Sequence, residues 1–213
     1  MSFRRKFLRF AFHLLYNQLA FTYDLVAAVV SFGQWKRWGR TALDRVRGDR
    51  VLELGHGPGH LLIALARSGR RPIGIDLSPH MGRLAQKNMR RAKVSVPQVR
   101  CRSQALPFRS NTFDSCVATF PTEYIVDPKT VWEIRRVTND RGRLVIVAGA
   151  QIGDRKPSAR LIDWLYRVTG QSDPLPRGSE SIFDQAGLKP RIETEHVGHS
   201  QVMLLVADKD QAG

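Results

Sequence analysis

The segment Val51-Leu-Glu-Leu-Gly-His-Gly-Pro-Gly59 constrains the fold of this 213-residue chain more than any other. It is an apolar strand that ends near the acid Glu53 and leads into three closely spaced glycines, and an amphipathic helix follows. Such a strand, turn and helix N-terminus gather backbone N–H groups around a polar ligand. A second apolar run, 72–75, ends in Asp76, where an acid can accept hydrogen bonds from ribose hydroxyls. Together the two segments predict a binding site for a nucleoside-bearing cofactor.

The spacing of the glycines distinguishes between such cofactors. A dinucleotide fingerprint, G-x-G-x-x-G, has its third glycine one residue later than Gly59. Glu53 stands two residues before the first glycine and can bond to a ligand amine, a group that a pyrophosphate lacks. The alternative is an ordinary strand–turn–helix with flexible glycines, but the register of both acids with the turn favours a cofactor site.

The turn resembles motif I, D/E-x-G-x-G-x-G, of the class I S-adenosylmethionine (SAM)-dependent methyltransferases. The resemblance implies an enzyme that binds SAM, with Glu53 at the methionine end of the cofactor and Asp76 on its ribose. It also implies that the glycines allow the backbone to approach the cofactor closely. By the same resemblance, the other cofactor contacts are expected at Gly55, Gly57, Gly59, Leu77, Met81, Ser103, Gln104 and Phe120.

A downstream segment narrows the resemblance to one branch of that family. Residues 104–114 resemble the A-x-x-L-P-F-x-x-x-x-F-D segment of the branch that contains the ubiquinone/menaquinone-biosynthesis and bacterial phospholipid N-methyltransferases. The match spans roughly residues 45–150, with a tail to about 207. One departure concerns adenine recognition, because the family places Asp or Asn where this chain offers Arg102. This arginine either stacks on the adenine or points to solvent.

Strand and helix patterns alternate along the chain and predict an α/β fold. Strands are expected at 51–54, 72–75, 98–101, 114–120 and 143–149, and helices at 60–68, 79–92, 128–137, 159–167 and 179–186. Segments 189–197 and 201–207 are expected to form a closing hairpin. With the antiparallel last strand that the resemblance implies, the expected fold is a doubly wound, mostly parallel seven-stranded sheet with helices on both faces.

The first 21 residues form the second informative feature. On a helical wheel, a basic and polar face lies opposite a wide aromatic and aliphatic face, a pattern typical of a helix that lies in a membrane interface. The segment is too polar to span a bilayer, and polar residues interrupt the apolar run that a signal peptide needs. The alternative is a helix that packs on its own domain or covers the substrate pocket. We therefore divide the chain into a helical segment, 1–40, and a SAM-binding domain, 41–213.

Net charge limits the choice of partners. The chain carries +15, which favours polyanions, namely nucleic acid or an anionic membrane surface. Residues 1–47 alone hold nine Lys/Arg against two acids, and no aromatic-interleaved RNA-binding signature accompanies them. We expect a cytoplasmic protein that is peripheral on the inner face of the membrane. The two cysteines are too few for a disulfide framework, and no Cys/His cluster has the spacing of metal ligands.

The acceptor of the methyl group is less constrained than the donor. The leading hypothesis is a membrane-borne, lipid-like acceptor, either a phospholipid amine or a quinone-type ring. The alternatives are a soluble methyltransferase for RNA or a small metabolite, and a non-catalytic SAM-binding partner protein. The resemblance implies that the hydroxyl of Tyr23 approaches the methyl donor, which makes Tyr23 the candidate catalytic residue. The alternative is a structural role, with the Tyr23 ring in the core. A ring-carbon acceptor needs a base, and the candidates are Tyr23, Glu123, His196 and His199.

Overall fold

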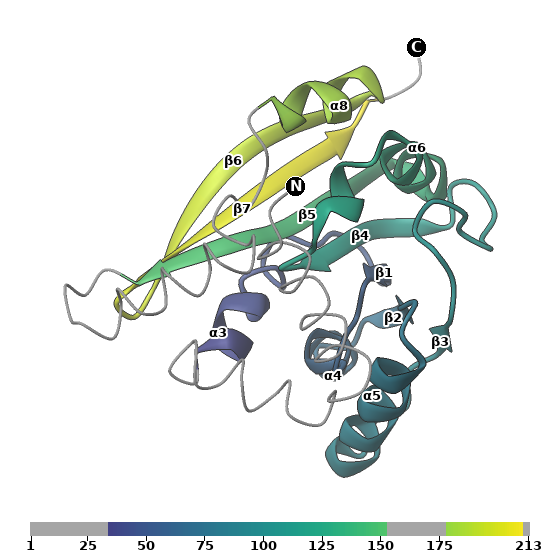
Figure 1. Ribbon diagram of the computed structural model, residues 1–213, viewed down its shortest axis with the longest axis vertical. Helices are drawn as coiled ribbons and strands as arrows, with labels where there is room; N and C mark the ends of the chain where they lie inside the picture. Colours follow the sequence, from purple (N-terminus) through teal and green to yellow (C-terminus); the bar gives the residue numbers. More distant parts are fainter. Residues whose placement is uncertain (1–33, 153–177, 211–213) are drawn as a thin grey trace, which may run out of the picture.

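The computed structural model describes residues 34–152 and 178–210, and a seven-stranded sheet organises them (Figure 1). The strand order is β3-β2-β1-β4-β5-β7-β6. Strands β1 to β5 are parallel, and β7 runs antiparallel to both of its neighbours. The strands are β1 Arg50–Leu54, β2 Arg71–Ile75, β3 Gln98–Val99, β4 Phe113–Thr119, β5 Thr138–Ile152, β6 Leu188–Val197 and β7 Ser200–Lys209. The predicted fold class is confirmed.

Helices cover both faces of this sheet. They are α3 Trp35–Arg40, α4 His60–Arg67, α5 Pro79–Ala92, the 3-10 turn η1 Glu123–Val126, α6 Pro128–Val137 and α8 Ser179–Gln185. Helices α5 and α6 begin in the same way, with a side-chain cap from Ser78 or Asp127 followed by a proline in the first turn. That chemistry explains why the predicted bounds of both helices agree with the structure.

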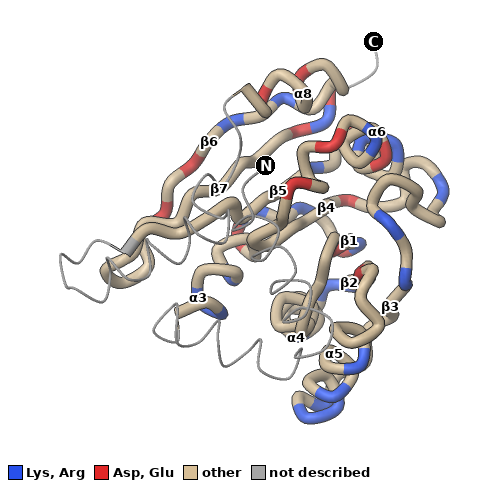
Figure 2. The backbone as a smooth tube through the Cα atoms, in the orientation of Figure 1, with Lys and Arg blue, Asp and Glu red and all other residues tan. Residues whose placement is uncertain are grey.

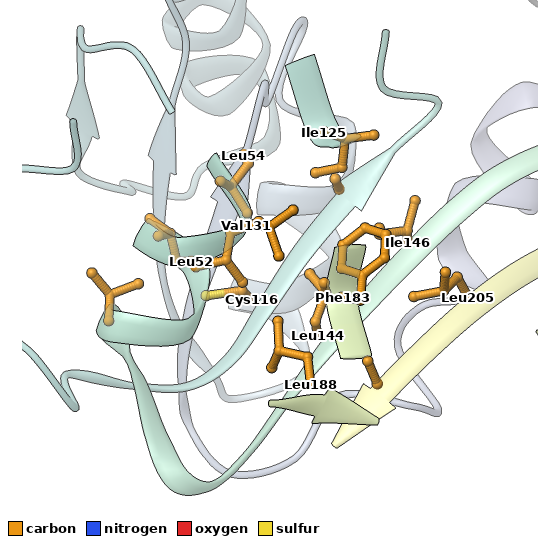
Figure 3. Packing of buried hydrophobic residues seen from close by; sticks show 14 of the residues in the cluster. Leu52, Leu54, Cys116, Ile125, Val131, Leu144, Ile146, Phe183, Leu188 and Leu205 are labelled. Atoms are coloured by element: carbon orange, nitrogen blue, oxygen red, sulfur yellow. The ribbon is translucent and has the colours of Figure 1, made fainter. Parts of the chain in front are cut away.

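Alternation along β1 divides the core between the two faces, because successive side chains of a strand point to opposite sides. Leu52 and Leu54 pack against α6 and α8, where Phe183 is fully buried (Figure 3). Val51 packs on the other face, with Trp38 of α3 and apolar residues of α4. The single acid in this strand shares the face of Val51 and so points toward α4.

Strand β5 is longer than predicted, and its start shows a local irregularity. It begins at Thr138, directly after α6, rather than at residue 143. Thr138 pairs with Phe113, and the register then shifts before Arg143 pairs with Ser115. This irregularity places extra residues in β5 opposite β4. The polar sequence of the stretch has no periodicity that would predict it.

Several predictions fall on residues that the structure does not describe. These are the N-terminal amphipathic helix, the candidate catalytic Tyr23 and the helix at 159–167. The domain boundary after residue 40 also stays a prediction. Within the described part, Trp38 is fully buried between the sheet and α4, so the end of the 1–40 segment packs directly on the domain.

Candidate cofactor-binding site

Glu53 lies at the end of β1 and is almost completely buried, with 1% of its surface exposed. The backbone N–H of Leu62 donates a hydrogen bond to its carboxylate. This bond satisfies one N–H in the first turn of α4, because the N-cap residue Gly59 has no side chain to do so. The other oxygen, Oε2, is buried and has no hydrogen-bond partner among the described residues. Burial, and then the negative charge of nearby Asp76, raise the pKa of Glu53 well above its ordinary value. A ligand with an amino group would supply the missing partner.

The glycine turn between β1 and α4 needs glycine for two different reasons. Gly55, Gly57 and Gly59 have φ angles of +68°, +49° and +78°, a region that L side chains rarely adopt. A Cβ atom at Gly55 would also stand 2.5 Å from the hydroxyl of Tyr124. At Gly57 nothing lies within 4 Å of that position, so the backbone there is open to close approach. The predicted spacing of the turn therefore has a structural basis.

Asp76 ties this turn to the end of β2. Its Oδ2 atom accepts the N–H of Gly57 at 2.9 Å, and its Oδ1 atom accepts the N–H of Ser78 at 2.8 Å. The residue is buried, and its charge acts on both Glu53 and His56. The structure thus brings the two predicted acids and the glycines together.

His56 supports the turn from inside. Its Nδ1 atom lies 2.8 Å from the carbonyl oxygen of Gly57, and its Nε2 atom faces the amide nitrogen of Gln98 at 3.4 Å. A neutral ring that carries its proton on Nδ1 satisfies both contacts. Burial lowers the pKa of His56, although the Asp76 carboxylate opposes that effect. Gly74 makes room for the ring, since a Cβ there would lie 2.9 Å from it.

The other predicted cofactor contacts differ in exposure and in the elements that they touch. Leu77 follows Asp76 and exposes 53% of its surface, so it offers an apolar surface beside the acid. Met81 is fully buried, and its N–H bonds to the cap of α5. The ring of Phe120 stacks on Trp35 of α3 at a centroid distance of 3.9 Å. The structure therefore brings Leu77 to the acids, whereas the side chain of Met81 lies in the core and that of Phe120 turns to α3.

The loop that carries Ser103 and Gln104 is fixed by α6. Ser103 is buried, and the amide of Gln104 donates to Asp127 at 3.0 Å. Arg136 donates to the carbonyl oxygens of residues 106 and 108, while Glu133 accepts the N–H of residue 106. The Arg136–Glu133 hydrogen bond lowers the pKa of Glu133 and raises that of Arg136. The side chain of the unusual Arg102 is exposed in this loop.

Tyr124 contacts the glycine turn, although the sequence analysis did not single it out. Its hydroxyl donates to the carbonyl oxygen of Leu54 at 3.1 Å and lies directly over Gly55. It comes from η1, just after β4, at the carboxyl ends of the strands where ligands bind in such sheets. The only sequence signal is its position in Phe120-Pro-Thr-Glu-Tyr124 after an expected strand.

The candidate bases lie in two places. Glu123 is exposed in η1, next to Tyr124. His196 and His199 are exposed on the β6–β7 hairpin, where His196 contacts Gln201 at 3.1 Å. Among the candidate bases that the structure describes, Glu123 lies nearest in sequence to the glycine turn's contact, because the next residue, Tyr124, touches that turn.

Comparison with known proteins decides what this site belongs to. Residues 51–142 match a family model described as a methyltransferase domain. The chain is also 32% identical over 203 residues to a demethylmenaquinone methyltransferase of Mycobacterium sp. (strain KMS), in a match that covers 88% of this chain and 85% of that protein. The chain belongs to the class I SAM-dependent methyltransferases.

Solved structures share the fold of this methyltransferase at low sequence identity. A geranyl diphosphate C-methyltransferase from Streptomyces coelicolor A3(2) has a TM-score of 0.61 and 16% identity, with 81% of this chain and 78% of that one covered. The cyclase SpnF has a TM-score of 0.62 and 19% identity, with 83% and 81% covered. Since their names denote different reactions, the fold alone does not fix the reaction.

Membership in the family makes this chain an enzyme whose methyl donor is SAM. The described residues fit that cofactor. SAM carries an amino group and a ribose, and the site offers the orphaned Oε2 of Glu53, an open glycine turn and Asp76. Each of these features suits one part of the cofactor.

Proposed function

We propose that this methyltransferase transfers the methyl group of SAM to a ring carbon of a reduced, quinone-type acceptor. The observation that carries the proposal is the match to a demethylmenaquinone methyltransferase over 88% of this chain and 85% of that relative. A match of this extent includes the regions on both sides of the glycine turn. It supports a shared acceptor class as well as a shared donor.

The site residues support a role for each part of the donor. Glu53 would accept the SAM amino group through Oε2, the open backbone at Gly57 would allow the methionine end to approach, and Asp76 would bind the ribose hydroxyls. Leu77 would offer its exposed apolar side chain to the adenine. Methyl transfer then needs the acceptor in line with the sulfonium carbon, so the protein acts mainly by alignment.

A quinol acceptor adds a requirement that an amine acceptor lacks. Its ring carbon becomes strongly nucleophilic when a ring hydroxyl loses its proton, and the ring carbon loses its own proton after the new C–C bond forms. SAM would supply the electrophilic methyl group, with a neutral thioether as the leaving group. In this proposal Glu123, exposed beside Tyr124, takes the hydroxyl proton, and Tyr124, whose hydroxyl lies over Gly55, positions the acceptor.

The acceptor of this proposal is membrane-borne, and the charge of the chain supports that location. Four Lys/Arg lie within residues 4–9, and each is worth about 1 kcal/mol near an anionic surface. None of the helices in the described ranges has the length and apolar character that crossing a bilayer requires. We therefore propose a peripheral enzyme at the cytoplasmic face of the membrane.

Lipid extracts test this acceptor class. Mass spectrometry would compare extracts from cells with and without the protein and search for pairs that differ by one methyl group. We expect the quinone pool to lose its methylated form when the protein is absent. A methyl difference confined to phospholipid headgroups would assign the amine acceptor instead, and unchanged quinones would contradict the proposal.

A further inference from the structure

A cavity of about 400 Å³ lies between α3, α4 and α5, beside the end of β4. Its lining contains four cationic side chains, Lys36, Arg40, Arg67 and Arg91. The rest of the described lining is polar or apolar and includes Trp35, His60, Leu61, Ile63 and Phe120. Of the residues predicted to contact the cofactor, only Phe120 lines this cavity. The cavity is therefore distinct from the site formed by Glu53, the glycine turn and Asp76.

The positive charge of the cavity is not neutralised by acidic residues in its described lining. No Asp or Glu is among them, and Lys36, Arg40 and Arg91 form no ion pair within residues 34–152 and 178–210. The guanidinium of Arg67 donates to the carbonyl oxygen of Ala92 at 2.9 Å, which leaves its charge uncompensated. Like charges that face one concave space repel, and a concave wall concentrates their field. The arrangement therefore favours an anionic ligand with several acceptor oxygens.

The wider surface adds to this local charge. Residues 60–102, which carry α4 and α5, hold ten Lys/Arg against one acid. Residues 178–210, at the opposite end of the sheet, hold three Lys/Arg against six acids. Figure 2 shows basic residues along α5, whereas β6 and α8 carry acidic residues with a few basic ones among them. An approaching anion is thus drawn to the end of the molecule that contains the cavity.

One wall of the cavity is apolar, and its backbone is unusual. Phe120 stacks on Trp35 there, with Leu61 and Ile63 alongside. Phe120 has φ +48°, a left-handed conformation that is uncommon for a bulky residue. Backbone conformations of this kind gather at ligand sites, where the surrounding structure holds them. A phosphate alone would use only the cationic wall, so the complete ligand also has an apolar part.

The lining of the cavity runs along α4 between the two edges of the sheet. At the cofactor edge, His60 and Leu61 directly follow the glycine turn, and Phe120 follows the last residue of β4. Arg67 and Arg91 lie at the C-terminal ends of α4 and α5, near the other edge. An elongated ligand would therefore contact these cations at one end and the aromatic wall at the other.

From these observations we infer that the cavity between α3, α4 and α5 binds the phosphate group of an amphiphilic molecule, with its apolar part against Trp35 and Phe120. Guanidinium groups suit phosphate because they offer paired donors in a fixed plane. The phosphate belongs either to a phospholipid of the bilayer or to a free phosphorylated compound. The inference does not depend on which acceptor is methylated.

The test uses the full chain with two double variants of equal charge. Arg40→Gln with Arg91→Gln removes two cations that line the cavity. Lys87→Gln with Arg90→Gln removes two exposed cations from α5 that do not line it. Each protein is titrated with inorganic phosphate, with monomeric short-chain phosphatidic acid and with phosphatidylglycerol vesicles. A SAM titration and a thermal unfolding curve show that each variant is folded, and Lys36→Gln with Arg67→Gln repeats the test if the first pair fails to fold.

We expect the wild-type protein to bind phosphatidic acid at least about 10-fold more tightly than phosphate, because of the apolar wall. The cavity variant should bind it at least about 10-fold more weakly, and the control variant should change less than about 3-fold. If the cavity variant alone also loses vesicle binding, the phosphate belongs to a phospholipid of the bilayer. If both variants bind vesicles equally, the phosphate belongs to a free compound. Equal losses of phosphatidic acid binding in both variants, or no saturable binding to the wild type, would overturn the inference. Loss of quinol methylation would not affect it, so the two proposals fail separately.

Discussion

At the scale of single residues, we expect Glu53 to have opposite effects on stability and on SAM binding. Its buried carboxylate has one oxygen without a partner among the described residues, and its pKa lies well above the ordinary value. An acid whose pKa is raised by folding stabilises the folded state fully below the unfolded pKa, and that contribution is lost as the pH rises through the folded pKa. The ligand-free protein therefore carries this cost at neutral and alkaline pH, and a cationic ligand amine relieves it.

Glu53→Gln separates these effects. The amide keeps the shape and an acceptor for the Leu62 N–H but removes the ionisable carboxyl group. We expect the variant to be more stable than the wild type by about 1 kcal/mol at neutral pH, with the difference shrinking in acid. Its affinity for SAM should fall about 10-fold or more, because the amino group loses its charged partner. Thermal unfolding across pH and calorimetric SAM titration measure the two quantities.

The matched control for that substitution is Glu180→Gln, which changes the same atoms on an exposed residue of α8. It should leave SAM affinity unchanged. Equal SAM affinity in the wild type and in Glu53→Gln would contradict the placement of the amino group on Glu53.

Tyr124→Phe tests the residue that holds η1 over the glycine turn. Removing the hydroxyl deletes the 3.1 Å bond to the Leu54 carbonyl, at a cost of about 1 kcal/mol in stability. We expect kcat to fall about 10-fold while the Kd for SAM changes little, because small misalignments of an acceptor strongly reduce transfer. Steady-state kinetics with SAM titration separate the two, and Trp132→Phe on the exposed surface of α6 is the control. An unchanged kcat would remove Tyr124 from the acceptor site.

The sequence identifies residues whose role depends on local spacing, and it misses those whose role depends on distant contacts. Glu53 and Asp76 flank glycines in a strand–turn–helix pattern, so their proximity follows from topology alone. Tyr124 contacts a carbonyl that is 70 residues away in the chain. Nothing in its neighbourhood signals that partner, and the orphaned oxygen of Glu53 likewise becomes visible only in three dimensions.

At the scale of elements, α6 and the loop at 102–110 act as one unit. Helix α6 was predicted with correct bounds, but its contacts with the loop were not. Glu133 and Arg136 look like an ordinary exposed pair at i,i+3 spacing, whereas in the structure both bond to the backbone of the loop. Periodicity predicts which face of a helix is apolar, but it does not indicate which polar residues reach another element.

Arg136→Ala should loosen this loop. The change removes donors to two backbone carbonyls, so we expect faster amide hydrogen exchange over residues 102–110. SAM affinity should fall by about 3- to 10-fold, because Ser103 and Gln104 lie on the loop. Hydrogen exchange followed by mass spectrometry measures the first effect. Arg135 makes no hydrogen bond to this loop among the described residues, so Arg135→Ala should change neither quantity. Unaltered hydrogen exchange of the loop in Arg136→Ala would refute this coupling.

At the scale of the whole molecule, charge is distributed unevenly along the sheet. The end that carries α4 and α5 is strongly basic and the β6 end is acidic, so a nearby anionic surface would orient the protein (Figure 2). The fold itself followed from the sequence because strand and helix periods alternate clearly. The separation of basic and acidic residues to opposite ends of the sheet could not be predicted from the sequence, because it depends on the strand order.

Replacing the four basic residues at positions 4, 5, 6 and 9 by Gln tests membrane association. We expect binding to anionic phosphatidylglycerol vesicles to weaken by about 100-fold or more, since each charge contributes about 1 kcal/mol. Binding to the wild type should also weaken as salt rises. Vesicle co-sedimentation measures both effects, with neutral phosphatidylcholine vesicles as the control. Association that is insensitive to these charges and to salt would argue against an electrostatic membrane contact.

The most direct measurement for the proposed function is methyl transfer in a purified system. The protein is mixed with SAM carrying a deuterated methyl group and with a chemically reduced demethylated naphthoquinone, and the products are analysed by mass spectrometry. The account predicts a labelled methyl group on the quinone ring, formed by the wild type and strongly reduced in Glu53→Gln at limiting SAM. A protein that binds SAM but leaves the reduced quinone unlabelled would contradict it.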